Sequence, residues 1–332
     1  MVDRRKRVTS ADVAREAGLS RATVSYVLND SPDRAIPEAT RRRVLEAAER
    51  LGYTPYAPAR MLRSGRSEVV LLVLPDRPQG PVGHAMVEQM AEALAESGLT
   101  LVTHLSTERS PRGVWNAIAP AAVVGGMLFT PEQTADMRRA GVGVIVPSDG
   151  QAAQIRGGES SWSFRIGRLQ AEHLIERGLH RLCYALPGDP RLQDIARQRL
   201  NGARKGCREA EIAEPMVATV PLDPEAAAQI VDGWFSASKA PTGVCAFNDE
   251  VALAVLAGMR KHGLSAPADL AVIGADDIAA ARLAAPPLTT ITLDAGQVGR
   301  SVAAYVIAAL SGDDPGARPD AETLCVIHRA ST

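Results

Sequence analysis

Four residues within a stretch of six positions have side chains of the kinds that proteins use to read DNA bases. Arg21 can form two hydrogen bonds with the N7 and O6 atoms of guanine, and Ala22 can contact the methyl group of thymine. Ser25 is small enough to let a helix approach the base edges, and Tyr26 can offer its hydroxyl group to a base or a phosphate. These residues share one side of a helical pattern and predict contacts in the major groove.

Hydroxyl and amide side chains lie around this group. Thr9, Ser20, Thr23 and Asn29 are predicted to bind phosphate oxygens, which fixes the register of a protein on DNA without reading its sequence. The same residues also fit a three-helix bundle with no role in nucleic-acid binding, and the pattern alone leaves both interpretations open.

Three short helices are expected to position these side chains. Thr9 can cap the first helix, with Asp12 completing a capping box. In the turn Gly18-Leu19-Ser20, the glycine can adopt the left-handed conformation and the serine can cap the second helix, residues 21–29. A third helix is expected over residues 37–51. A helix, a glycine turn and a second helix with an exposed polar face are typical of a helix-turn-helix.

From Ser67 on, continuous apolar segments alternate with helical patterns. This alternation predicts parallel sheets covered by helices on both faces, and the number of strands favours two α/β subdomains over one sheet. The predicted strands include residues 69–74, 99–102, 127–129, 142–146, 181–186, 217–220, 243–247 and 270–273.

Polar residues stand at the ends of two of these strands. Asn248 and Asp249 follow strand 243–247, and Asp276 follows strand 270–273. Doubly wound sheets bind ligands at the carboxyl ends of their strands, so these residues are candidates for binding a small polar molecule. Trp162 and Phe247 are candidates for stacking on a sugar ring, although a place in the core explains Phe247 better.

The charge is unevenly distributed along the chain. Residues 1–66 contain 14 lysines and arginines and 8 aspartates and glutamates, a net charge of +6, whereas the remaining residues have a net charge of −7. A basic N-terminal part favours a polyanion such as DNA as the partner. The four cysteines are widely spaced and are expected to be reduced core residues.

Several classes of function are not expected. The sequence has no zinc-ligand spacing, no phosphate-binding loop and no nucleophile elbow, so no metal, no cofactor and no enzymatic activity are predicted. No apolar run is long enough to span a bilayer, and no apolar segment follows the basic N-terminus as it would in a secretory signal. A cytoplasmic protein, associated with the nucleoid and not with a membrane, is therefore expected.

Residues 8–29 closely resemble the DNA-binding segment of the lactose-repressor (LacI/GalR) family of transcriptional regulators. The resemblance continues through residues 41–53 and the hinge segment Ala59-Arg60-Met61-Leu62-Arg63. It resumes at three later motifs, which are Phe247–Ala252, Gly274–Asp277 and Pro286–Ile291.

The resemblance implies an α/β fold in which an N-terminal all-α helix-turn-helix headpiece precedes a two-lobed, periplasmic-binding-protein-like core of doubly wound parallel sheets. The expected domains are the headpiece at 1–54, a hinge helix or linker at 55–67, and an effector-binding and dimerisation core at 68–332. Within the core, the expected N-lobe comprises about 68–160 and 294–316, and the expected C-lobe about 161–291 and 318–332.

The resemblance also implies a homodimer that binds palindromic double-stranded operator DNA, probing its minor groove with the hinge residues Ala59, Leu62 and Arg63. Leu62 stands where the family inserts a leucine between base pairs, which kinks the duplex. Arg199 matches the family's arginine at the start of a helix in the effector cleft. The expected effector is a small polar metabolite, a sugar or a derivative of one, and the expected function is that of a sequence-specific DNA-binding transcriptional regulator acting as a repressor.

The N-terminal lobe departs from the family pattern. The segment Asp76–Val82 replaces the usual Asn-Pro-Phe-Phe-like sequence, Val124-Gly125-Gly126 replaces a usual Asp-Gly pair, and Ser163-Phe164-Arg165 lacks the usual aspartate. A non-sugar effector, or none, therefore remains an alternative. A binding receptor with no role on DNA is a further alternative, against which the basic headpiece argues.

Overall fold

The computed structural model describes residues 8–28, 36–53, 67–107, 113–125, 129–147, 159, 161–237, 242–316 and 324–332. The chain forms two compact units, Met1–Ser67 and Glu68–Thr332, which we call the headpiece unit and the core unit. Asn29, Ala59, Leu62 and Arg63 lie outside the described residues, as does most of the predicted hinge. No helix of the described residues has the length and apolar character needed to cross a membrane.

The headpiece unit contains three short helices, α1 (Ser10–Ala17), α2 (Arg21–Leu28) and α3 (Glu38–Arg50). Each helix has one apolar face, and the three faces meet in a small core. The buried members of this core are Val13, Ala14, Ala17, Val24, Val27, Val44, Ala47 and Ala48. The predicted helices are confirmed with shifts of one or two residues at their ends.

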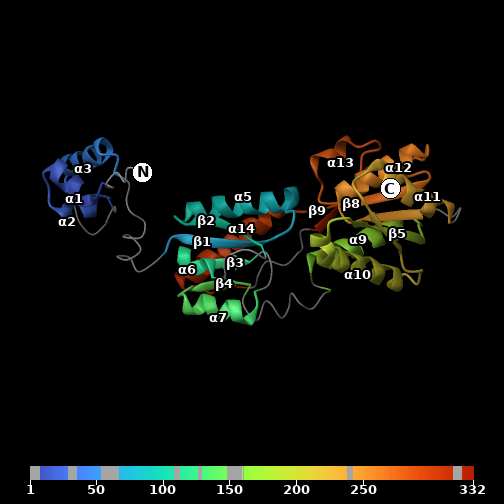
Figure 1. Cartoon of the computed structure of the whole chain (residues 1–332), viewed down its shortest axis with the longest axis horizontal. Coiled ribbons are helices and arrows are strands. Elements are labelled where there is room, and N and C mark those ends of the chain that lie inside the picture. The colour runs from blue at the N-terminus through green and yellow to red at the C-terminus, as the bar shows by residue number, and fades with distance from the viewer. Residues whose placement is uncertain are drawn as a thin grey trace, which may run out of the picture. The chain divides into compact units, whose positions relative to one another are not determined.

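In the core unit, the first sheet has four parallel strands in the order β2-β1-β3-β4. The strands are β1 (Val69–Pro75), β2 (Thr100–Ser106), β3 (Ala122–Gly125) and β4 (Val144–Val146). Alternate residues of β1 face opposite sides, so Val70 and Leu72 pack under α5 (Gly80–Glu96) and α14 (Ala295–Ser311). Leu71 and Val73 pack under α6 (Val114–Ile118) and α7 (Pro131–Arg139). We call this sheet with its four helices the N-lobe (Figure 1).

The second sheet has six strands in the order β10-β9-β8-β7-β5-β6, with only β10 antiparallel to its neighbour. The strands are β5 (Arg181–Pro187), β6 (Met216–Val220), β7 (Thr242–Ala246), β8 (Leu270–Ala275), β9 (Thr289–Leu293) and β10 (Leu324–Ile327). We call this sheet and its helices the C-lobe. The chain returns from β9 to the N-lobe as α14 and then contributes β10 to the C-lobe.

Helices cover both faces of the second sheet. They are α9 (Trp162–Glu176) and α10 (Gln193–Glu209), then α11 (Pro224–Ser236) and α12 (Asp249–Lys261), with the short α13 (Ala279–Leu283) and the 3-10 turn η1 (Pro190–Leu192). The first pair packs on one apolar cluster of the sheet and the second pair on another. The expected doubly wound architecture is therefore confirmed.

One predicted strand is not found at its described residue, and residues 127 and 128 lie outside the described part of the chain. The sequence predicts a strand at residues 127–129, whereas the third strand of the first sheet is Ala122–Gly125, which pairs with β1 from Val70 to Val73. Phe129, the described residue of the predicted strand, is buried in the apolar cluster beneath α6 and α7 without belonging to a strand. Residues 122–125 and 127–129 are both apolar segments of the kind that forms a buried strand. Only the pairing with β1 decides which of them joins the sheet.

Candidate nucleic-acid interface and effector site

Helix α2 has an exposed side and a buried side. Arg21 and Ala22 are exposed, whereas Val24 and Val27 are buried in the headpiece core. Ser25 and Tyr26 are half-buried. The apolar residues three positions apart anchor the helix, which leaves Arg21 and Ala22 free to face a partner.

The turn before α2 is held by local hydrogen bonds. Gly18 adopts φ = 62°, in the left-handed region that glycine occupies without strain. The Ser20 hydroxyl accepts a hydrogen bond from the backbone N–H of Thr23 at 3.0 Å and lies 2.9 Å from the Thr23 hydroxyl. The predicted cap of α2 by Ser20 is confirmed.

Helix α1 is fixed at both ends. The Asp12 carboxylate accepts hydrogen bonds from the backbone N–H and the hydroxyl of Thr9, at 2.9 and 2.6 Å. These hydrogen bonds are the main cause of the lowered pKa of Asp12. Arg43 of α3 donates to the carbonyl oxygen of Ala17 at 2.6 Å, which satisfies one of the carbonyls left open at the end of α1.

In the C-lobe, Arg199 of α10 lies at the centre of a second polar group. Arg199 is only 8% exposed, and its guanidinium donates to the carbonyl oxygen of Phe247 and, at 3.3 Å, to the Asp276 carboxylate. The guanidinium also lies 4.6 Å from the centre of the Phe247 ring. Three of the sequence-predicted effector residues, from α10 and from the ends of β7 and β8, therefore come together.

Asn248 and Asp249 have structural contacts. The Asn248 side chain accepts a hydrogen bond from the backbone N–H of Val251 at 3.1 Å and so caps α12. Asp249 is fully buried and accepts hydrogen bonds from the Thr290 hydroxyl at 2.6 Å and the Ile278 backbone N–H at 2.9 Å. Burial raises the pKa of Asp249 to about 7 in spite of these hydrogen bonds. This position favours a role in the scaffold over the predicted contact with an effector.

Trp162 packs among apolar residues. It is the first residue of α9, is half-buried, and packs against the apolar cluster of the N-lobe together with Leu293. These contacts give the indole a packing role where the two lobes join.

Sequence reasoning did not single out Asp76, Arg77 and Arg191 as site residues. Asp76 directly follows β1, and its carboxylate lies 3.6 Å from the guanidinium of Arg191 in η1, across the two lobes. Arg77 is half-buried. Its pKa is lowered, first by burial and then by the positive charge of Arg199. The sequence feature that could have identified Asp76 and Arg77 is their position directly after the buried strand β1.

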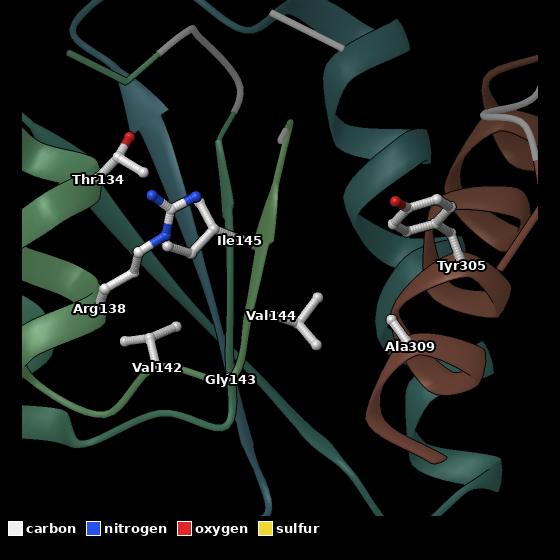
Figure 2. Close-up of a pocket in the computed structure, with 8 residues that line it drawn as sticks. All are labelled: Thr134, Arg138, Val142, Gly143, Val144, Ile145, Tyr305 and Ala309. Atoms are coloured by element: carbon white, nitrogen blue, oxygen red, sulfur yellow. The ribbon is translucent and has the colours of Figure 1, made fainter. Parts of the chain in front are cut away.

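A hollow of about 310 Å³ opens on the N-lobe, where edge strand β4 runs between α7 and α14 (Figure 2). It is lined by Thr134, Arg138, Val142, Gly143, Val144, Ile145, Tyr305 and Ala309. The Thr134 hydroxyl already donates to the Thr130 carbonyl oxygen at 3.1 Å. None of the lining residues belongs to the Arg199 group, and most are apolar, so this hollow is a separate feature.

Comparison with known proteins finds a match for the headpiece helices and another for the Arg199 group. Residues 9–56 match the bacterial regulatory proteins of the lacI family, and residues 171–332 match a periplasmic binding protein-like domain. The chain therefore combines a DNA-binding domain of the lacI family with a periplasmic binding protein-like domain. The lacI-family match covers α1, α2 and α3, and the match to the periplasmic binding protein-like domain covers the Arg199 group.

Similar proteins extend this likeness over most of the chain. A protein named HTH-type transcriptional repressor PurR from Haemophilus influenzae is 28% identical over 317 residues, which is 93% of each chain. The PurR of Actinobacillus pleuropneumoniae is 27% identical over 300 residues, or 88% of each chain. These relatives are transcriptional repressors, and the present chain is a DNA-binding transcriptional regulator, not an enzyme.

Solved structures show the same fold. The Lac repressor dimer bound to operator and the anti-inducer ONPF has a TM-score of 0.78 and 20% identity, with 98% of this chain and 99% of that chain covered. A complex of the transcriptional regulator CelR with cellobiose has a TM-score of 0.61 and 24% identity, with 98% and 100% covered.

Proposed function

We propose that the chain is a homodimeric repressor that places α2 in the major groove of a palindromic operator. The observation that supports this most directly is the exposed Arg21–Ala22 side of a capped α2 in a basic, lacI-family headpiece. Arg21, Ala22, Ser25 and Tyr26 contact base edges in this proposal. Thr9, Ser20, Thr23 and Asn29 contact phosphates.

The hinge residues Ala59, Leu62 and Arg63 act in the minor groove in this proposal. Leu62 is an apolar wedge that opens a central base step, and the wedge offsets part of the unstacking cost of a few kcal/mol. Such a regulator works at the nucleoid in the cytoplasm.

The effector is a small polar metabolite bound between the lobes. Arg199, Asp276 and Phe247 support this because they lie together at the carboxyl ends of β7 and β8. Asn248 lies beside them at the start of α12. An effector that prefers one arrangement of the lobes by about 1–3 kcal/mol would change operator affinity about 5- to 150-fold.

The test is a selection of operator sequences with the full-length protein, followed by fluorescence anisotropy on the best site. Arg21→Ala should weaken binding to that site by about 1–3 kcal/mol and relax the preference at one base pair in each half-site. Arg260→Ala, which removes an exposed charge from α12, is the matched control and should leave the selected sequence unchanged. Identical selected sequences for wild type and Arg21→Ala would contradict the assignment of α2.

A further inference from the structure

The end of β1 presents two charged residues in a fixed turn. The Gln79 side-chain amide donates to the carbonyl oxygens of Pro75 at 3.2 Å and of Arg77 at 2.9 Å. These two hydrogen bonds hold the backbone between the strand and α5. Asp76 and Arg77 therefore stand on an ordered part of the N-lobe.

The start of α10 meets this turn. Arg191 bridges two carboxylates, lying 2.7 Å from Asp189 and 3.6 Å from Asp76. This ion pair brings η1, and α10 behind it, to the end of β1. Arg77 is then close enough to the buried Arg199 for the charge of Arg199 to help lower the pKa of Arg77.

The acidic residues nearby have other partners. Asp189 and Asp76 pair with Arg191, and Asp194 lies 2.5 Å from the guanidinium of Arg197. Within the described residues Arg77 forms no ion pair.

The charge of Arg199 is only partly balanced. Its one carboxylate partner, Asp276, lies at 3.3 Å, and its buried Nε atom has no hydrogen-bond partner in the described part of the chain. The nine-tenths buried Arg199 thus has one carboxylate partner, and the carboxylate whose charge acts on the half-buried Arg77, that of Asp194, is itself paired with Arg197. A buried donor without a partner is unfavourable, so the Nε atom of Arg199 and the half-buried guanidinium of Arg77 are left able to bind a ligand where the lobes meet.

We propose that the effector is an anion, a small metabolite carrying a phosphate or carboxylate group that Arg77 of the N-lobe and Arg199 of the C-lobe bind together. This inference rests on the proposed function, in which an effector binds between the lobes.

The chemistry of the two arginines supports this class of ligand. Each guanidinium is a planar fork that binds carboxylate or phosphate oxygens in pairs, and an anion between two forks removes their mutual repulsion. A neutral sugar can accept hydrogen bonds from the same groups but leaves the positive charges uncompensated. Because the arginines belong to different lobes, an anion would also stabilise the arrangement in which the lobes lie together.

The experiment measures thermal stabilisation of the full-length protein by D-glucose, glucose 6-phosphate, D-gluconate and inorganic phosphate, each against sodium chloride of equal ionic strength. The phosphate or the carboxylate probes should raise the melting temperature by on the order of 3 °C at ten times their Kd, with glucose inactive. The comparison of glucose 6-phosphate with gluconate distinguishes the two sources of negative charge.

Two variants make the test specific. Arg77→Gln should lower the affinity for the active anion about tenfold or more, and it should leave the melting temperature without ligand equal or higher because a repulsion is removed. Arg208→Gln, at the other end of α10, removes the same charge and should behave as wild type.

Equal stabilisation of wild type and Arg77→Gln by the anions would overturn the proposal, as would stabilisation by glucose equal to that by its charged derivatives or no stabilisation by any probe. These results leave the role on DNA intact. The proposed role on DNA is refuted by a different result, which is that the wild type selects no operator sequence.

Discussion

Helices α9 and α10 touch backbone to backbone at two glycines, and this contact sets the position of Arg199. A Cβ atom added to Gly167 would lie 1.7 Å from the carbonyl oxygen of Arg199, and one added to Gly202 would lie 1.9 Å from that of Phe164. Real Cβ contacts essentially never fall below 3.0 Å. We therefore predict that Gly167→Ala forces the helices apart beside the effector arginine.

The expected cost follows from this geometry. The Gly167 contact must open from 1.7 Å to at least 3.0 Å, and rigid backbone lies on both sides. Overpacking of this kind costs about 1–3 kcal/mol or more, while alanine regains at most about 1 kcal/mol of helix propensity. With a net loss of about 2 kcal/mol, the melting temperature of the core unit should fall by roughly 4–8 °C.

Gly233 in α11 is the matched control. A Cβ atom there would meet nothing within 4 Å, so Gly233→Ala should stabilise the core unit by about 0.5–1 kcal/mol through helix propensity alone. Scanning calorimetry of the three proteins gives the comparison. A Gly167→Ala protein that melts at or above the wild-type temperature would refute the reasoning from close helix contact.

Three further predictions concern pH and salt. Burial, with smaller effects of His328 and Arg177, lowers the pKa of His173 to about 4, so the folded protein binds fewer protons than the unfolded one and stability should fall as pH drops from about 6.5 to 4. His173→Gln should reduce the fall of the melting temperature between about pH 6.5 and 4, and an unchanged fall would contradict the prediction. Burial raises the pKa of Asp249 to about 7, which has the opposite effect, since stability that is present near pH 4 is lost as pH rises through 7. Asp249→Asn should therefore melt higher than wild type above pH 7 but not at about pH 4, and an equal difference at both pH values would contradict this. Operator affinity should fall steeply between about 50 and 200 mM salt as counterions are released, and a flat titration would exclude the proposed phosphate contacts.

Features of the headpiece that depend on neighbouring residues could be predicted from the sequence. The capping contact between Thr9 and Asp12, the left-handed Gly18 and the cap by Ser20 all appear in the structure. Each depends on interactions within three or four positions of the chain, where residue type and spacing determine the geometry.

Features that depend on distant partners could not be predicted. The third strand of the N-lobe is chosen by its pairing with β1, which lies about 50 positions earlier in the chain. The rule for strand ends placed Asp249 and Asp276 at the same edge of the sheet. It could not show that Asp249 turns inward, because that depends on Thr290, 41 positions away.

The backbone at the end of β8 indicates why Asp276, and not its neighbours, is available to Arg199. Asp276 and Asp277 have φ values of 102° and 46°, in the region that L residues rarely adopt, and such residues cost about 1–3 kcal/mol each. The surrounding structure holds them there, since the Asp276 N–H donates to the carbonyl oxygen of Ile291 at 2.8 Å and the Asp277 carboxylate pairs with Arg329. The strained turn thus commits Asp277 to the scaffold and directs Asp276 toward Arg199. A relaxed turn would not need two anchors, so the strain itself favours a functional role for Asp276.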